Sequence, residues 1–332
     1  ALGEDSDGNM LLIFSRSPYW MSDLNNINPV FVVIDSIQTL HDDSVDSTSG
    51  SISQIRECTR ALLNWAKSRG IPVMISGHVT KEGEIAGPRM LEHMVDVVLY
   101  MEGDTASPLR LLRAVKNRFG SLNEIGVFEM FDRGLVEILD PSSVFLSEHK
   151  EGMAGSVVIS TLEGSRPLLL EVQALTNRST IPVPRRVATG VDNTRLLLIC
   201  AILTRRAGIL LHNHDVVVNI PGGLKISEPA ADLGIALSIV SSLHNSPITS
   251  NLAVIGELGL TGEVRGVTQI ERRVAEVSRL GFKQCLVPKN RDWHSKSQSD
   301  TIPTTPVNTI TEAIRASIPG VSTKMNDNSR VG

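Results

Sequence analysis

The stretch Phe31-Val32-Val33-Ile34-Asp35-Ser36 decides the fold that the sequence predicts. Four consecutive apolar residues are typical of a short buried strand, and here an acid follows the strand directly. In open α/β sheets, ligands gather at the carboxyl ends of the strands, so a carboxylate at this point can hold Mg²⁺ directly or through water. The alternative is that Asp35 only caps the turn after the strand, and this stretch alone leaves both interpretations open.

Strands and helices alternate after this stretch. The first half predicts a strand over Val30–Ile34, a helix over Ser53–Arg69 with Ser53 as N-cap and Gly70 as stop, and strands over Pro72–Ser76, Val95–Met101, Leu109–Lys116 and Val127–Phe131. This order indicates a parallel sheet with crossover helices, finished by antiparallel strands. The pattern weakens around Pro141–Gly155, where we place a domain boundary.

The second half also mixes helices with strands. Helices are predicted over Asn193–Arg206, from Pro229 to about Leu243, over Ile270–Leu280 and over Ile310–Ile318. Ser227 is the expected cap of the second of these helices. The polar tail from Thr323 to Gly332 is expected to be disordered.

Composition narrows the class of protein. The net charge of −4 over 332 residues provides no global attraction for nucleic acid, so any DNA contact has to come from local basic loops. Cys58, Cys200 and Cys285 form no C-x-x-C pair, which predicts neither a zinc site nor a disulfide framework and suits a reducing compartment. No apolar run approaches the ~20 residues that span a bilayer, so no membrane partner is expected. The N-terminus lacks both Met and a basic segment, which indicates a piece of a longer chain rather than a signal peptide.

Charged and polar residues follow the other predicted strands. His78 comes after Pro72–Ser76, where it can sense a γ-phosphate or simply bond within its own loop. Lys81–Arg89 combines cations with glycines, a composition that suits either contact with a phosphate backbone or a solvated loop. Lys116 and Arg118 share one face of a strand, so both can address one anion, either a neighbouring subunit's nucleotide or DNA. Ordinary surface charge is the alternative.

Several motifs occur in one order along the chain. They are Asp35-Ser36-Ile37-Gln38-Thr39, Gly50–Glu57, Gly77–Gly87, Leu91–Asp96, Lys116–Gly120, Gly155-Ser156, Glu171–Leu175, Gly222–Lys225 and Gly256–Arg265. This ordered set resembles the RadA/Sms family of bacterial-type DNA repair proteins over roughly residues 1 to 318. The pentapeptide Lys116-Asn117-Arg118-Phe119-Gly120 matches the signature of that family.

The resemblance implies an α/β fold in two domains. Residues 1–145 correspond to the C-terminal part of a RecA-like P-loop ATPase core with a mostly parallel sheet, and residues 152–318 to an α+β Lon-protease-like domain of the ribosomal S5 type, followed by a disordered tail over residues 319–332. The family forms hexameric rings on single-stranded or branched DNA and uses ATP to process recombination intermediates, which makes a RecA-type recombinase an expected partner. A bacterial cytoplasm and an organelle of bacterial ancestry, a chloroplast or a mitochondrion, both fit.

The same resemblance implies roles for individual residues. Asp35 and Ser36 lie on the Mg²⁺ side of bound ATP, with Asp35 as the acid that holds the ion indirectly, and His78 occupies the nucleotide-sensing position. Ser44–Ser53 and Lys81–Arg89 match the two loops that face DNA. The implied catalytic residues are Asp35, His78, Lys116 and Arg118, and the implied DNA-binding residues are Ser51, Gln54, Arg56, Lys81, Arg89, Lys116 and Arg118. ATP and Mg²⁺ are the implied cofactors, and zinc is not expected in this chain.

Two parts of the family pattern are absent from the sequence. It contains no G-x-x-x-x-G-K-[ST] phosphate loop and no four-cysteine zinc module. The backbone donors of a phosphate loop are what grips the nucleotide. Two functions therefore stay open: a DNA-dependent ATPase motor in its full-length form, and a non-catalytic truncated paralogue that binds DNA or joins family rings without ATP turnover.

The second domain also departs from the active Lon proteases that it resembles. Lon proteases use a Ser–Lys dyad, in which the lysine activates the serine. Ala230 stands at the serine position and Glu271 near the lysine position, so we expect no protease activity and an assembly role instead. Four cations, Lys225, Arg265, Arg272 and Arg273, can form a basic DNA-facing surface or be unpatterned surface charge.

Overall fold

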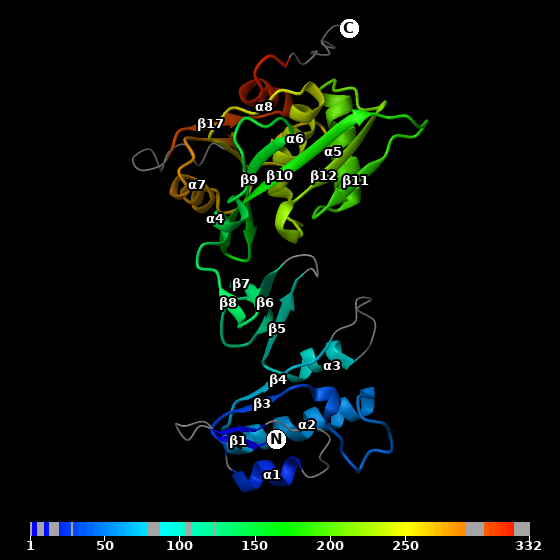
Figure 1. Cartoon of the computed structure of the whole chain (residues 1–332), viewed down its shortest axis with the longest axis vertical. Coiled ribbons are helices and arrows are strands. Elements are labelled where there is room, and N and C mark those ends of the chain that lie inside the picture. The colour runs from blue at the N-terminus through cyan, green and yellow to red at the C-terminus, as the bar shows by residue number, and fades with distance from the viewer. Residues whose placement is uncertain are drawn as a thin grey trace. The chain divides into compact units, whose positions relative to one another are not determined.

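The chain is described by a computed structural model that covers residues 2–4, 10–12, 20–27, 29–78, 87–103, 108–122, 124–289 and 302–321. It divides into two compact units, which are described separately (Figure 1). The first contains Ala1–Leu99 and Ala114–Leu122, and the second contains Tyr100–Arg113 and Asn123–Gly332. These units are defined by packing, and the domain limits at residues 145 and 152 stay a prediction.

The first unit is built on a β–α–β motif. Strands β3 (Val32–Ile34) and β4 (Val73–Ile75) pair in parallel, with Ile34 beside Ile75. Helix α2 (Ile52–Arg69) lies between them in sequence, because parallel neighbours need a crossover connection. The carboxyl ends of β3 and β4 therefore meet at one edge of the sheet.

The ends of α2 follow local capping rules. The Oγ atom of Ser51 accepts a hydrogen bond from the Gln54 N–H at 3.4 Å, so Ser51 is the N-cap and the predicted Ser53 is not. Gly70 ends the helix in the left-handed conformation with φ of 68°, as predicted, because glycine adopts that conformation without steric cost. The helix thus begins one residue before its predicted start and ends where the sequence indicated.

The core of the first unit packs α2 against the strand pair and α1 (Trp20–Ile27). It comprises Trp20, Leu24, Val32, Ile34, Ile37, Leu40, Ile55, Cys58, Leu62 and Trp65. The remaining elements are β1 (Leu2–Glu4), β2 (Met10–Leu12), the 3₁₀ turn η1 (Ile37–Thr39) and α3 (Gly87–Met94). This core fixes the strand ends that carry Asp35 and His78.

A four-stranded sheet follows in the order β5-β6-β7-β8. Its strands are β5 (Val97–Glu102), β6 (Leu109–Asn117), β7 (Ile125–Phe131) and β8 (Gly134–Glu137). The pairs β6–β7 and β7–β8 are antiparallel, as predicted for the end of the first half. Strands β5 and β6 each contribute residues to both units.

The second unit holds a seven-stranded sheet in the order β11-β12-β10-β9-β13-β16-β17. The strands are β9 (Ser156–Glu163), β10 (Arg166–Arg178), β11 (Arg186–Thr189), β12 (His214–Asn219), β13 (Leu252–Val254), β16 (Gln284–Pro288) and β17 (Thr304–Val307). Only β10 pairs antiparallel with its neighbours, and the other contacts are parallel. This sheet is mostly parallel, and the predicted α/β class is confirmed.

Helices pack on both faces of that sheet, since the neighbouring residues Val157 and Val158 of β9 belong to two different apolar clusters. The helices are α4 (Pro141–Phe145), α5 (Asn193–Arg206), α6 (Asp232–His244), α7 (Ile270–Arg279) and α8 (Ile310–Ser317), with 3₁₀ turns η2 (Pro221–Gly223) and η3 (Pro229–Ala231) and a small hairpin of β14 (Glu257–Leu258) and β15 (Val264–Arg265). Helix α6 is buried almost throughout. Its predicted cap was wrong: the 3₁₀ turn η3 intervenes, so Ala231 precedes the helix and Ser227 lies exposed before the turn.

The predicted disordered tail from Thr323 lies outside the described residues. Within the ranges given above, no helix combines the length and the apolar character that a membrane crossing requires.

Candidate functional site

Asp35 and Ser76 meet where the two parallel strands of the first unit end. The register that places Ile34 beside Ile75 brings the next residues together, and Ser76 Oγ donates a hydrogen bond of 2.5 Å to Asp35 Oδ1. Backbone bonds from Ser76 N to Ile34 O at 2.8 Å and from Ile37 N to Ser76 O at 3.0 Å continue the pairing beyond the strands. Asp35 is an exposed residue.

His78 lies two residues further along the same edge. Its side chain is exposed, and its carbonyl oxygen accepts a hydrogen bond from Gln38 Nε2 at 3.5 Å. The Gln38 Oε1 atom is buried and has no partner among the described residues. Ser36 is buried, and its carbonyl accepts hydrogen bonds from the Thr39 side chain and amide. The structure therefore brings Asp35, Ser36 and His78 to one edge, as the strand order requires.

The donor set at this edge suits Mg²⁺ only in company with other ligands. A carboxylate and a hydroxyl are hard oxygen donors, and Mg²⁺ is usually bound by one or two carboxylates together with waters and substrate phosphates. Over the described ranges, no cluster of three His, Cys, Asp or Glu side chains is placed to hold a metal ion. Were a magnesium–nucleotide complex bound at this edge, Asp35 could contribute one carboxylate ligand to the ion.

The loop at residues 41–50, which we call the polar loop, is organised around Gln54. The amide side chain of Gln54 is completely buried and bonds to the backbone of the loop. Asp42 adds an internal turn, because its carboxylate accepts from the Ser44 amide at 2.9 Å and from Ser44 Oγ at 2.6 Å. These hydrogen bonds hold the pKa of Asp42 below its ordinary value.

Other implied DNA-binding residues lie near or beyond this loop. Ser51 caps α2, and its Oγ donates to Ser47 Oγ at 2.9 Å. Arg56 is exposed one turn into α2 and lies 3.4 Å from the carboxylate of Glu57. Lys81 lies outside the described residues, and Arg89 belongs to α3, without a described side chain.

The signature cations are held by backbone and by an acid. Lys116 Nζ donates to the carbonyl oxygen of Glu92 at 2.6 Å, in the last turn of α3, where unsatisfied helix carbonyls attract cations. Arg118 pairs with Asp96, Nη1 to Oδ1 at 2.7 Å. Phe119 beside it is 80% exposed. Sequence reasoning missed both contacts, because the partners Glu92 and Asp96 lie 24 and 22 residues before the two cations.

The turn after these cations is fixed by one amide side chain. Asn117 Oδ1 accepts from the Phe119 amide at 3.0 Å, and its Nδ2 donates to the Ser121 carbonyl at 3.3 Å. A Cβ at Gly120 would lie 3.1 Å from Asn117 Nδ2, which is tighter than ordinary packing. The order Asn-x-Phe-Gly in the pentapeptide therefore has a conformational reason.

In the second unit, Ala230 is 1% exposed within η3 and Glu271 is exposed in the first turn of α7. Two ion pairs, each with one buried partner, flank Ala230. Asp232 accepts from Arg195 Nε at 2.6 Å and also from Arg195 Nη2. Glu228 accepts from both terminal nitrogens of Arg273. The start of the α6 region is therefore fixed by charge pairs on both sides of Ala230.

Arg273 corrects one expectation. Its side chain is fully buried, with further bonds from Nε to the Thr268 carbonyl and from Nη1 to the Ser160 carbonyl, both at 2.9 Å. It cannot belong to a basic surface, because every donor group points into the protein. Lys225, Arg265 and Arg272 are exposed, but Arg265 is paired with Glu263 and Glu257.

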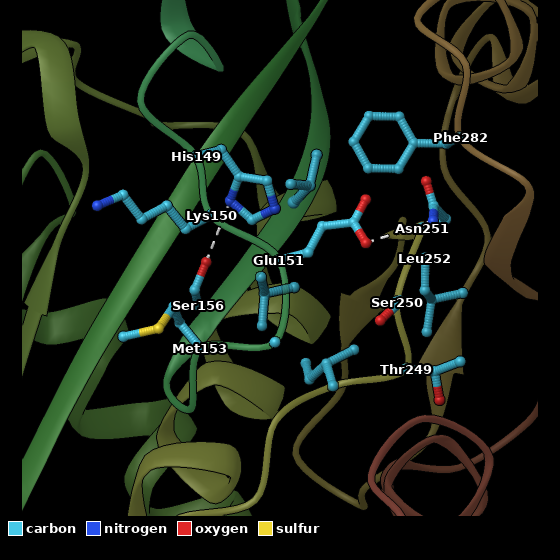
Figure 2. A pocket seen from close by; sticks show the side chains of 14 residues that line it. His149, Lys150, Glu151, Met153, Ser156, Thr249, Ser250, Asn251, Leu252 and Phe282 are labelled. Atoms are coloured by element: carbon cyan, nitrogen blue, oxygen red, sulfur yellow. Dashed lines mark hydrogen bonds between the residues drawn. The ribbon is translucent and has the colours of Figure 1, made fainter.

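A small cavity in the second unit lies between the chain around His149 and the turn before β13 (Figure 2). Its labelled lining includes Lys150, Glu151, Asn251 and Phe282, and Asn251 Nδ2 donates to Glu151 Oε2 at 3.4 Å. Its volume is about 30 Å³, which is about the space of one water molecule. It is too small for a cofactor, and no implied site residue lines it.

A Ser–His–Glu cluster borders this cavity. His149 Nδ1 lies 3.0 Å from Glu171 Oε1, and Ser156 Oγ donates to that same carboxylate oxygen. A hydrolytic triad needs the serine on one ring nitrogen and the acid on the other, whereas here both neighbours address Nδ1. The cluster therefore anchors the chain before β9 to β10 and is not a nucleophile relay.

Three curated relatives of the chain share one name. The chain is 50% identical over 320 residues to the DNA repair protein RadA of Bacillus subtilis (strain 168), covering 96% of this chain and 69% of that protein. The RadA proteins of Listeria monocytogenes and Halalkalibacterium halodurans are 51% and 48% identical, covering 88% and 89% of the chain and 64% of each relative. A model for subunit ChlI of Mg-chelatase matches residues 185–291, under half of the chain.

Proposed function

Because the chain belongs to the RadA family of DNA repair proteins, we propose that it acts in DNA repair and recombination as part of an ATP-linked machine on single-stranded or branched DNA. The chain spans 64% to 69% of the length of these three relatives. ATP and Mg²⁺ are its proposed cofactors.

The observation that carries this proposal is the shared edge of β3 and β4. Asp35 and His78 lie at the carboxyl ends of neighbouring parallel strands, the position at which α/β proteins bind nucleotides. The polar loop begins only a few residues after Asp35 and returns to the N-terminus of α2. A change at the nucleotide edge thus has a short path to a loop proposed to face DNA.

Lys116 and Arg118 are proposed to couple the nucleotide to DNA. Both are held near backbone or acid partners, which keeps their charges at fixed positions. A fixed guanidinium can stabilise the charge that develops on a phosphoryl group, whether the nucleotide is bound to the same subunit or to a neighbouring one. Assembly into hexameric rings and cooperation with a RecA-type recombinase belong to the same proposal.

The second unit is proposed to be a Lon-like domain that serves assembly and has no peptidase activity. Ala230 offers no nucleophile, and Glu271 offers no basic amine to activate one. The ion pairs of Asp232 and Glu228 support a structural use of this region. The compartment, a bacterial cytoplasm or an organelle of bacterial ancestry, stays a prediction.

An alternative function is favoured by one specific observation. The sequence contains no Walker A phosphate loop, so this polypeptide by itself is also suited to bind DNA, or to join rings of relatives, without turning over ATP. In that case Asp35 and Lys116 would retain their places in the fold but not their chemistry.

One experiment separates these functions. DNA-stimulated ATP hydrolysis is measured for the chain, for Lys116→Ala and for Lys67→Ala, an exposed lysine of α2 that removes the same charge elsewhere. Turnover that DNA raises, that Lys116→Ala abolishes and that Lys67→Ala leaves intact supports the motor. Salt-sensitive binding of single-stranded DNA without turnover supports the alternative. Neither turnover nor binding would contradict both.

A further inference from the structure

Gln54 is the residue that gives the polar loop its shape. Its side chain runs back from the first turn of α2 beneath residues 41–50. The Oε1 atom accepts from the Asp42 amide at 2.8 Å, and the Nε2 group is shared by the carbonyls of Asp42 at 3.0 Å, Val45 at 3.0 Å and Ser47 at 3.1 Å. One side chain thus connects three points of the loop to α2.

Two further side chains outside the loop also contact it: Trp20 Nε1 donates to the His41 carbonyl at 2.9 Å, and Ser53 Oγ lies 2.8 Å from Ser47 Oγ. The loop's own backbone bonds are short turns, from Val45 N to Asp42 O at 3.1 Å and from Ser47 N to Val45 O at 2.8 Å. Val45 is the only aliphatic residue in the segment 41–50, so apolar burial cannot fix the loop. Hydrogen bonds from the buried amide of Gln54 therefore hold the loop where apolar packing is lacking.

We infer that Gln54 is a positioning residue for DNA binding, which holds the polar loop in its binding conformation without touching DNA. The side chain is 0% exposed and all its polar atoms already have partners inside the loop, so it has none left for a base or a phosphate. The contact role implied for Gln54 by resemblance passes to exposed loop residues such as Ser44, Thr48 and Ser49. This inference rests on the proposed function.

The expected loss of DNA affinity follows from the fraction of molecules in which the polar loop is ordered. An apparent dissociation constant is the intrinsic one divided by the fraction of molecules in the competent conformation. If loss of the Gln54 bonds leaves roughly a tenth of the molecules with an ordered loop, affinity for single-stranded DNA falls about tenfold. The salt dependence should stay unchanged, since no phosphate contact of Gln54 is lost, whereas removing one phosphate contact lowers that slope by about one.

The test compares the wild-type chain with Gln54→Met, which retains length and removes every hydrogen bond, by fluorescence anisotropy with a single-stranded oligothymidylate at two salt concentrations. Leu62→Ala is the matched control, because Leu62 is equally buried in the same helix but does not bond to the loop. Hydrogen exchange of the Asp42 amide reports loop order, and exchange within α2 reports folding. Gln54→Glu, which keeps the acceptor for Asp42 and loses the donors, is the second variant if Gln54→Met does not fold.

The inference predicts fast exchange at Asp42, about tenfold weaker binding and an unchanged salt slope for Gln54→Met, with wild-type affinity for Leu62→Ala. Wild-type affinity in a Gln54 variant whose Asp42 amide exchanges fast would overturn it, and so would an equal loss in Leu62→Ala. Absence of binding by the wild-type chain would be a different result, since it overturns the proposed function and this inference with it.

Discussion

The guanidinium of Arg273 is fully buried and donates to both carboxylate oxygens of Glu228, 45 residues earlier in the chain. Removing the cation leaves a carboxylate in a largely dry place, and breaking a buried pair in this way costs about 3–5 kcal/mol. Because Glu228 retains bonds from the Leu162 amide and Thr161 Oγ1, we expect Arg273→Met to cost about 3 kcal/mol, at the lower end of that range.

Urea unfolding measures this cost, with Arg272→Met as the control. Arg272 is the exposed neighbour on α7, so its replacement should change stability by less than about 0.5 kcal/mol. Equal midpoints for the two variants would contradict the assignment of a structural role to the Arg273–Glu228 pair.

The polar loop carries three acids and no lysine or arginine, which bears on how it meets DNA. Asp43 and Asp46 are exposed, and their charges repel phosphate. If the loop faces DNA, Asp43→Asn with Asp46→Asn should tighten binding of single-stranded DNA by about two- to threefold per charge at low salt, since exposed charges separated by several Å interact by less than about 1 kcal/mol.

The binding titration is repeated with Asp132→Asn, an exposed acid in the turn between β7 and β8. An increase in affinity that Asp132→Asn shares would indicate a general charge effect. An unchanged affinity in the loop variant would show that the loop does not approach the DNA backbone.

Glu171 gives the second unit a dependence on pH. Burial alone would raise the pKa of Glu171, but the hydrogen bonds from His149 and Ser156 outweigh it and hold the pKa below its ordinary value of 4.5. A carboxyl whose pKa is lower in the folded state stabilises the fold above the unfolded pKa. That stabilisation disappears as the pH falls through the folded pKa, below 4.5.

Thermal unfolding between pH 7 and pH 3 tests this assignment. Glu171→Gln should unfold at a lower temperature than the wild-type chain at pH 7, and the difference should shrink as the pH falls below 4.5. A difference that stays constant over this range would mean that the effect of the substitution is packing and not ionisation.

Cys58 is expected to resist thiol reagents while the first unit is folded. Burial raises the pKa of Cys58 to about 11, and the thiolate is the reactive form. The Sγ atom also lies 3.8 Å from Gln54 Oε1, beneath the polar loop. An aromatic disulfide reagent at pH 8 should therefore label Cys58 only as fast as the unit unfolds, and peptide mapping identifies the modified residue. Labelling within seconds in the absence of denaturant would contradict this.

Local rules made much of the fold predictable from sequence. The apolar run before Asp35, the periodic helix ending at Gly70 and the alternation of elements were enough to place β3, α2 and β4, and hence to bring Asp35 and His78 to one edge. Two predicted helix caps were wrong. At α2, Ser51 and Ser53 are both suitable N-caps by residue type, and only the structure shows that Ser51 is used. At α6, residue type did not reveal the 3₁₀ turn η3 that separates Ser227 from the helix.

Contacts between distant residues were not accessible in the same way. Arg273 looked like a surface cation because its partner lies in another element. The resemblance implied that Gln54 contacts DNA, and nothing in its sequence neighbours indicates that its side chain is buried. Both are polar side chains whose burial and hydrogen-bond partners exist only in the folded protein. The direct roles of Asp35, His78, Lys116 and Arg118 stay predictions.

The contact between Lys116 and the end of α3 has a consequence for ligand binding. An ammonium group has three N–H donors, and Lys116 Nζ gives one of them to the Glu92 carbonyl at 2.6 Å. A donor that remains could bond to a phosphate oxygen while this contact stays intact. The same amine would then join a bound anion to the last turn of α3, so anion binding would stabilise the end of that helix.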